Sequence, residues 1–179
     1  MIEICNKTDC VGCGACLSAC NHEAITMQPD SLGFLYPEIN QEKCVDCGLC
    51  VKSCLNNHTP SFKVPIYTCV GHASDYYEQI SSTSGGIASV FMRAVLQNGG
   101  IVYGCSGVDA NDVKHIRIES PDEIEKLKGS KYVQSNMGLT YKTLVSDLRA
   151  GRVVLFIGTP CQVAGLKTYL RGRSYDNLY

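Results

Sequence analysis

The strongest chemical signal in the sequence is a pair of cysteine runs with one spacing, C-x2-C-x2-C-x3-C. The runs consist of Cys10, Cys13, Cys16 and Cys20, followed by Cys44, Cys47, Cys50 and Cys54. This spacing lets successive thiolates reach different irons of one four-iron cube, and in two-cluster proteins the fourth cysteine serves the opposite cluster. We therefore predict two [4Fe-4S] clusters, the first held by Cys10, Cys13, Cys16 and Cys54 and the second by Cys44, Cys47, Cys50 and Cys20.

Structural zinc and disulfides are the alternative uses of such cysteines. Zinc takes four ligands in a tetrahedron, so a third cysteine at the same interval in each run would be surplus. Disulfides are typical of secreted proteins, and residues 1–21 lack the basic and apolar stretches of a secretion signal. Asn21 and Leu55 follow the fourth cysteines where proline is usual. Because proline is not a ligand, this departure concerns the exit turn and not ligation.

Short elements are expected to position these cysteines. Gly12, Gly14 and Gly48 stand between the cysteines, where the backbone must turn tightly and direct N–H groups at sulfur. Residues 24–27 and 34–36 are predicted to form two strands joined by a turn. Residues 1–60 are thus expected to form an α+β ferredoxin-like two-cluster domain.

Residues 61–179 are expected to form a second domain of the α/β class. Helical patterns at 87–97, 139–148 and 163–170 alternate with strand-like segments at 101–105, 113–118 and 153–157. Ser120 begins a further helix, with Pro121 at its first position and Glu123 completing a capping box. Apolar strands that alternate with helices indicate a layered fold.

Two junctions in this second domain have residues suited to chemistry. Ser84, Gly85 and Gly86 leave backbone N–H groups uncovered at a helix N-terminus, which favours a phosphate, although such a sequence also suits an ordinary loop. Thr159 can cap the helix that Pro160 begins, and there the helix dipole would lower the pKa of Cys161. Cys161 is then a nucleophile, a cluster ligand or a small buried apolar residue.

The other cysteines and the histidines have no partner at a ligand spacing. Cys5, Cys69 and Cys105 are interpreted as small buried residues, and no role is assigned to His22, His58, His72 or His115. The formal net charge of -1 does not favour nucleic-acid binding. No stretch has the roughly 20 apolar residues of a membrane span, so we expect a cytoplasmic protein. Basic residues outnumber acidic ones in residues 61–179, which suits an anionic cofactor as well as an ordinary surface.

The order of the motifs resembles one known family. The paired cysteine runs are followed by Ser-Thr-Ser-Gly-Gly at 82–86, Gly-Ser-Lys-Tyr-Val-Gln-Ser at 129–135 and the block from Val154 to Leu166 that contains Gly-Thr-Pro-Cys-Gln. This arrangement is similar to the N-terminal part of the coenzyme F420 hydrogenase and dehydrogenase beta subunit family. By this resemblance the α/β flavin-binding domain is incomplete, and residues 177–179 begin another strand.

The resemblance implies an iron–sulfur flavoprotein oxidoreductase. It implies that FAD exchanges electrons with the clusters and a hydride with an F420-like small molecule, because a flavin connects one-electron and hydride chemistry. It places Ser84, Gly85, Gly86, Lys131 and Thr159 at the cofactor, and Cys161 at a further [4Fe-4S] cluster. A redox partner protein or subunit is expected. The alternative function is an electron-transfer module that relays electrons to a partner and has no substrate of its own.

Overall fold

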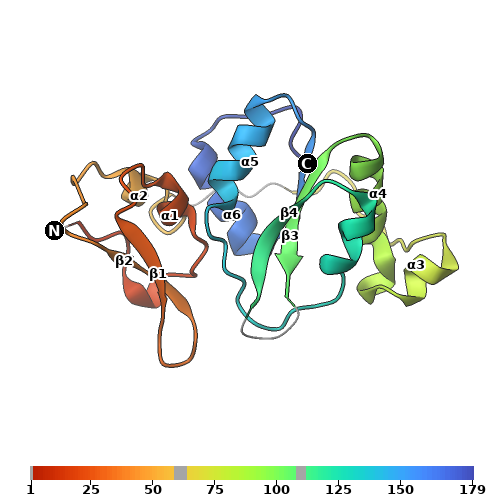
Figure 1. The fold of residues 1–179 in the computed structure, drawn as a ribbon, viewed down its shortest axis with the longest axis horizontal. Coiled ribbons are helices and arrows are strands. Elements are labelled where there is room, and N and C mark those ends of the chain that lie inside the picture. Colours follow the sequence, from red (N-terminus) through yellow and green to blue (C-terminus); the bar gives the residue numbers. More distant parts are fainter. Residues whose placement is uncertain (1, 59–63, 108–111) are drawn as a thin grey trace.

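The computed structural model describes residues 2–58, 64–107 and 112–179, so the expected domain boundary at residue 60 lies outside the described residues. The described α-helices are α1 (Ala15–Ala19), α2 (Leu49–Lys52), α3 (Tyr76–Ile80), α4 (Ile87–Gln97), α5 (Thr140–Arg149) and α6 (Pro160–Leu170). The described 3₁₀ helices are η1 (Lys7–Asp9), η2 (Thr83–Gly86) and η3 (Pro121–Lys126). The described strands are β1 (Ile25–Pro29), β2 (Leu35–Ile39), β3 (Ile101–Ser106), β4 (Lys114–Ile118) and β5 (Val154–Phe156). Figure 1 shows these elements in two groups, with α1, α2, β1 and β2 at one end of the molecule.

The N-terminal group is built on a β-hairpin and two short helices. Strands β1 and β2 are antiparallel, as the sequence predicts. The Asp30 carboxylate fixes their turn by accepting hydrogen bonds from the N–H groups of Leu32 and Phe34, both at 2.9 Å. Gly14 and Gly48 precede α1 and α2 with φ angles of 74° and 71°, a conformation that glycine adopts at little cost.

The second group is a three-stranded mixed sheet with helices on both faces. The strand order is β4-β3-β5, in which β3 pairs antiparallel with β4 and parallel with β5. Ile101 and Tyr103 of β3 pack with α5 and α6, whereas Val102 faces α4 and η3. Because successive side chains of a strand point to opposite faces, β3 contributes to two cores.

The helices and strands of this layer follow the sequence prediction closely. Ser120 and Glu123 form the predicted capping box, although the turn they start is a 3₁₀ helix. At the other end of the layer, Tyr179 lies alongside β5: its N–H donates to Val154 O at 2.9 Å, and its carbonyl accepts from Phe156 N at 2.9 Å. The last residues therefore extend the sheet beyond β5.

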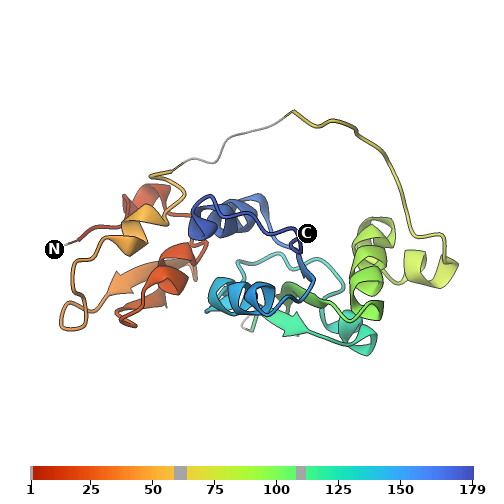
Figure 2. The ribbon, with the colours of Figure 1, turned by 90° about the horizontal axis from the view of Figure 1, so that it is seen from above.

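The chain crosses the molecule between its two groups of elements. Residues 64–72 follow an extended path that ends beside α3, at the end far from α1 and α2 (Figure 2). The chain then returns through the sheet, and α6 packs against α1. The seam between the two groups is therefore made by segments that are distant in sequence.

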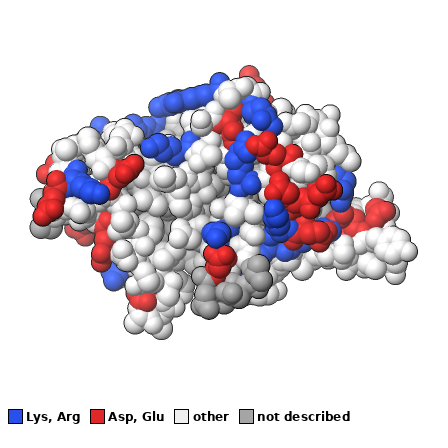
Figure 3. Space-filling view, in the orientation of Figure 1, with Lys and Arg blue, Asp and Glu red and all other residues white. Residues whose placement is uncertain are grey.

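On the face shown in Figure 3, acidic and basic residues mix over the end of the molecule that carries α4 and η3. There Glu78 of α3 pairs with Lys128 at 2.8 Å and with Arg93 at 2.9 Å. In the described part of the chain, no helix combines the length and apolar character needed to cross a membrane.

Candidate iron–sulfur sites and the adjoining cavity

The structure brings the cysteines of the two runs together in the crossed arrangement that the spacing predicts. One cavity is lined by Cys10, Cys13, Cys16 and Cys54, which we call the first cysteine group. Another cavity is lined by Cys20, Cys44, Cys47 and Cys50, which we call the second cysteine group. The fourth cysteine of each run thus lies with the first three of the other. This crossing follows from packing, because α1 and α2 lie against each other.

The arrangement of the thiols suits a multi-atom cluster. The thiols of each group line one cavity, as the ligands of a cube with iron at four corners do. The donor set of four cysteines in each cavity therefore fits a [4Fe-4S] cluster.

Burial makes these thiols hard to ionise unless a cation replaces the proton. It raises the pKa of the Cys13 thiol to about 11, and it also raises the pKa values of Cys16, Cys50 and Cys54. Backbone N–H groups act in the opposite direction by donating to sulfur, from Ala15 to Cys13, from Leu17 to Cys16 and from Val51 to Cys50. Such hydrogen bonds stabilise thiolates and would tune the potential of a bound cluster.

The first cysteine group lies directly against the α/β layer. A Cβ atom added to Gly165 of α6 would stand 3.1 Å from the Sγ and from the Cβ of Cys13. The Tyr141 hydroxyl of α5 lies 2.9 Å from the carbonyl oxygens of both Cys13 and Gln162. Only glycine at position 165 lets α6 approach the cysteine loop this closely.

Gln134 also holds the first cysteine loop in place, through side-chain hydrogen bonds. Its side-chain Nε2 donates to Val11 O at 3.1 Å, and its Oε1 accepts from Leu35 N at 2.8 Å. A Cβ at position 12 would lie 2.1 Å from Gln134 Nε2, and the φ angle of Gly12 is +61°. Gln134 lies in the 129–135 motif, but sequence reasoning did not single it out, because a glutamine that binds backbone has no spacing signature.

A third cavity of about 480 Å³ lies in the seam between the cysteine loop and the sheet. Val11 and Gly12 of the loop line one side, and Lys131, Thr159 and Cys161 line the other. Apolar side chains complete the wall, namely those of Ala88, Met92, Leu127, Val133 and Ile157. Its volume lies within the range of small-molecule sites, and a mostly apolar wall with a few polar groups is typical of them. We call it the seam cavity.

Lys131 supplies the positive charge of the seam cavity. Its ammonium group donates to Leu127 O at 3.0 Å and to Lys128 O at 2.6 Å. Burial lowers the pKa of Lys131. An ammonium group has three donor hydrogens, so one remains for an anionic ligand.

A buried polar chain forms another part of this wall. His115 Nε2 lies 3.1 Å from Ile157 O, a pure acceptor, so Nε2 carries the proton and Nδ1 accepts from Ser135 Oγ at 3.0 Å. Gln162 Nε2 donates to Ser135 Oγ at 2.8 Å. Burial lowers the pKa of His115, which keeps the ring neutral. The sequence assigns no role to His115, and the structure shows that it holds this wall of the seam cavity in place.

The glycine turn does not line the seam cavity with Lys131. Ser84, Gly85 and Gly86 all have left-handed φ angles, and Gly85 O accepts from Ala73 N at 2.7 Å. A Cβ on Gly86 would meet Glu78 O at 3.0 Å. These glycines therefore have a packing role against α3. Ala88, two residues further along the chain, does line the cavity.

The remaining cysteines differ from their sequence interpretation in three cases. Cys5 lines the cavity of the first cysteine group, Cys69 is exposed, and Cys105 is half-buried and lines the seam cavity. The expectation of small buried residues was wrong for Cys69, which is exposed, and Cys5 and Cys105 are only half-buried. Spacing along the chain also did not show that Cys5 and Cys105 line cavities, because folding makes those contacts. Cys161 lies 3.1 Å from the Thr159 hydroxyl.

Comparison with known proteins agrees with the N-terminal architecture. Residues 9–57 match the family of the 4Fe-4S dicluster domain, and a comparison with curated proteins gave no match. The match supports an N-terminal ferredoxin-like domain, and with it iron–sulfur electron transfer as the function of this region.

Proposed function

We propose that this chain is an iron–sulfur oxidoreductase that passes electrons between two [4Fe-4S] clusters and a flavin, FAD, in the seam cavity. The observation that carries the proposal is the position of that cavity: Val11 and Gly12 line both it and the cavity of the first cysteine group. A cofactor in the seam cavity would therefore be separated from the first cysteine group by little more than one loop. The likeness of the motifs to the F420 beta subunit family is a second, independent support.

The cysteine groups would act in a fixed order. The first cysteine group borders the seam, whereas the second reaches the surface through the exposed side chains of Val45 and Cys47. A redox partner protein would exchange electrons at this exposed end. The clusters, when bound, supply one-electron transfer, and the flavin supplies the exchange between single electrons and a hydride.

The residues of the seam cavity would bind and orient the flavin. Lys131 offers a charge-assisted hydrogen bond to an anionic group, and the apolar wall suits an aromatic ring system. Ser84, Gly85 and Gly86 lie just before α4, whose first turn reaches the cavity through Ala88. The N-terminus of α4 would then favour the diphosphate. The hydride partner is an F420-like small molecule in this proposal.

Flavin binding is the direct test. The holoprotein, reconstituted with iron and sulfide, is titrated with FAD, and binding is followed by flavin fluorescence. Lys131→Ala is expected to weaken FAD binding about ten- to a hundredfold, since a hydrogen bond to a charged group contributes about 1.5–3 kcal/mol. Lys142→Ala is the matched control, because Lys142 is exposed on α5 and does not line the cavity.

The outcomes separate two functions. Binding that Lys131→Ala weakens and Lys142→Ala leaves unchanged supports the flavoprotein. A holoprotein with full iron content that binds no FAD would instead support the electron-transfer module, which relays electrons to a partner without its own substrate. Gly85→Val is a poorer test, since a Cβ there already meets His72 Cβ at 3.0 Å and would disturb packing.

A further inference from the structure

A fifth cysteine stands at the first cysteine group. Cys5 lines the same cavity as Cys10, Cys13, Cys16 and Cys54. The thiols of Cys10 and Cys54 are close enough to that of Cys5 for both to act on its pKa. Cys5 therefore lies next to these two members of the first cysteine group.

Two asparagine side chains from the segment just after the second cysteine run hold Cys5 in this place. Asn57 Nδ2 donates to the carbonyl oxygen of Ile4 at 2.8 Å and to that of Val51 at 3.1 Å. Asn56 Nδ2 donates to Asp9 O at 2.7 Å and lies 3.8 Å from the Cys5 sulfur. The segment that follows Cys54 is thus tied to the backbone beside Cys5, so their closeness is built into the fold.

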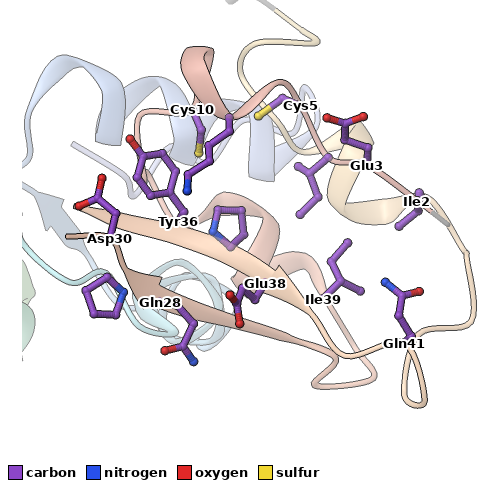
Figure 4. Close-up of a pocket in the computed structure, with 14 residues that line it drawn as sticks. Ile2, Glu3, Cys5, Cys10, Gln28, Asp30, Tyr36, Glu38, Ile39 and Gln41 are labelled. Carbon is purple, nitrogen blue, oxygen red and sulfur yellow. The ribbon is translucent and has the colours of Figure 1, made fainter. Parts of the chain in front are cut away.

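Cys5 is also reachable from the surface. Besides the cavity of the first cysteine group, Cys5 lines a pocket of about 550 Å³ on the outer side of the β-hairpin. Cys10, Lys7 and Tyr36 are among the other residues that line this pocket. Figure 4 shows Cys5 and Cys10 side by side at one end of this pocket. Its sulfur therefore lies between a cavity suited to a cluster and a pocket that admits small reagents.

We propose that Cys5 is a reserve ligand of the first cluster, able to bind iron in place of Cys10 or Cys54. In the exchange, the Cys5 thiol gives up its proton and forms one iron–sulfur bond, while the departing thiolate loses its bond and takes up a proton. The number of electrons on the cluster does not change. The inference rests on the proposed cluster at the first cysteine group and is independent of the flavin.

Alanine substitutions in the full chain, with and without Cys5, test this role. Cys54→Ala and Cys10→Ala are purified anaerobically, and iron and acid-labile sulfide are measured. With Cys5 present, at least one of them is expected to keep about eight iron per chain, four for each cube. Combined with Cys5→Ala, the same variant is expected to fall to about four. Cys13→Ala is the matched control and should fall to about four whether or not Cys5 is present.

Alkylation gives a second readout that does not depend on total iron. Iodoacetamide is expected to modify Cys5 in the native wild-type holoprotein, because there its thiol is spare. In the variant that keeps its iron, Cys5 is expected to be protected, which mass spectrometry of its peptide would show. The electron paramagnetic resonance signal of the second cluster verifies that each variant is folded.

The measurements distinguish a wrong cluster assignment from a wrong role for Cys5. Wild-type protein without iron and sulfide would overturn the cluster assignment itself. Wild-type protein with about eight iron, together with equal iron loss in Cys10→Ala and Cys54→Ala with and without Cys5, would overturn the reserve ligand alone. Cys5 that is alkylated equally in the wild type and in these variants would overturn it too.

Discussion

The two regions of this chain are held together by different means. In residues 2–58 the helices α1 and α2 have five and four residues, and three of the five buried residues of the core are Cys16, Cys50 and Cys54. In residues 112–179 the helices α5 and α6 have 10 and 11 residues and pack on a sheet. Helices of one turn are not stable alone. We therefore expect the first region to depend on bound clusters for its folding far more than the second does.

The seam is where this contrast weakens. Ala15 of α1 is fully buried in the core that α5 and α6 form with the sheet, and Cys13 packs against the same core. One face of the first cysteine loop is thus held by ordinary apolar packing, as well as by Gln134. We expect the N-terminal region to lose order unequally, with the seam the last part to open.

Removal of iron should have the largest effect. After anaerobic chelation, amide hydrogens of α2, β1 and β2 are expected to lose most of their protection, because binding of a structural metal site contributes directly to folding. Amides of β3 and α5 should keep theirs, since most of their core consists of apolar side chains from the sheet, α5 and α6. Hydrogen exchange followed by mass spectrometry measures both regions in one sample. Equal loss in both regions, or loss in neither, would contradict the contrast.

A larger side chain at position 165, in the seam, should have an intermediate effect on stability. Gly165→Val is expected to lower stability by about 1–3 kcal/mol, the usual cost of overpacking, because its side chain would press on Cys13 and the Tyr141 hydroxyl. The electron paramagnetic resonance signal of the first cluster should change, and the signal of the second cluster should not. Gly71→Val is the control, as a Cβ there meets only Ile87 Cδ1 at 3.9 Å. If both variants have the same free energy of unfolding in denaturant, the close approach at Gly165 does not contribute to stability.

The smallest effect should come from the ion pairs around α3. Lys128 and Arg93 hold the pKa of Glu78 at about 2, below the ordinary value of 4.5. A lowered folded-state pKa means that stabilisation is complete above pH 4.5 and is lost as the pH falls toward 2. Protection of the α3 amides, corrected for intrinsic exchange, should therefore begin to fall below about pH 4.5.

Glu78→Gln isolates this contribution from acid damage to the clusters. The variant should lose about 0.5–1 kcal/mol of local stability at neutral pH, within the range measured for ion pairs near a protein surface. Its α3 protection should be low at pH 7 and change little on acidification. A wild type and a variant with the same pH profile would show that another group controls α3.

Sequence reasoning predicted what depends on local pattern. The hairpin, α4 and the capping box at Ser120 follow from residue types at short spacing, and the structure has them. The crossed cysteine groups were predictable because C-x2-C-x2-C-x3-C carries its own geometry. The sequence pattern indicated an α/β layer but not the parallel pairing of β3 with β5. Their register depends on contacts between residues far apart in the chain, such as Ile101 with Val154.

The contacts across the seam could not be predicted in this way. Gln134 binds the cysteine loop through backbone groups, and Gly165 admits Cys13 by having no side chain; neither leaves a periodic signal. Cys5 was set aside because no partner lies near it in sequence, yet folding places it beside Cys54. The proposed phosphate role of the glycine turn was drawn from a local pattern that packing against α3 also explains.

Cys20→Ala tests the crossed cluster assignment most directly, because Cys20 belongs to the first run but lies in the second cysteine group. Iron and acid-labile sulfide are measured after anaerobic purification, together with the resonance spectrum of the reduced protein. We predict a fall from about eight to about four iron per chain, with the second cluster lost and the signal of the first retained. Loss of the first cluster with the second intact would contradict the crossing, and stoichiometric zinc without sulfide in the wild type would contradict the clusters.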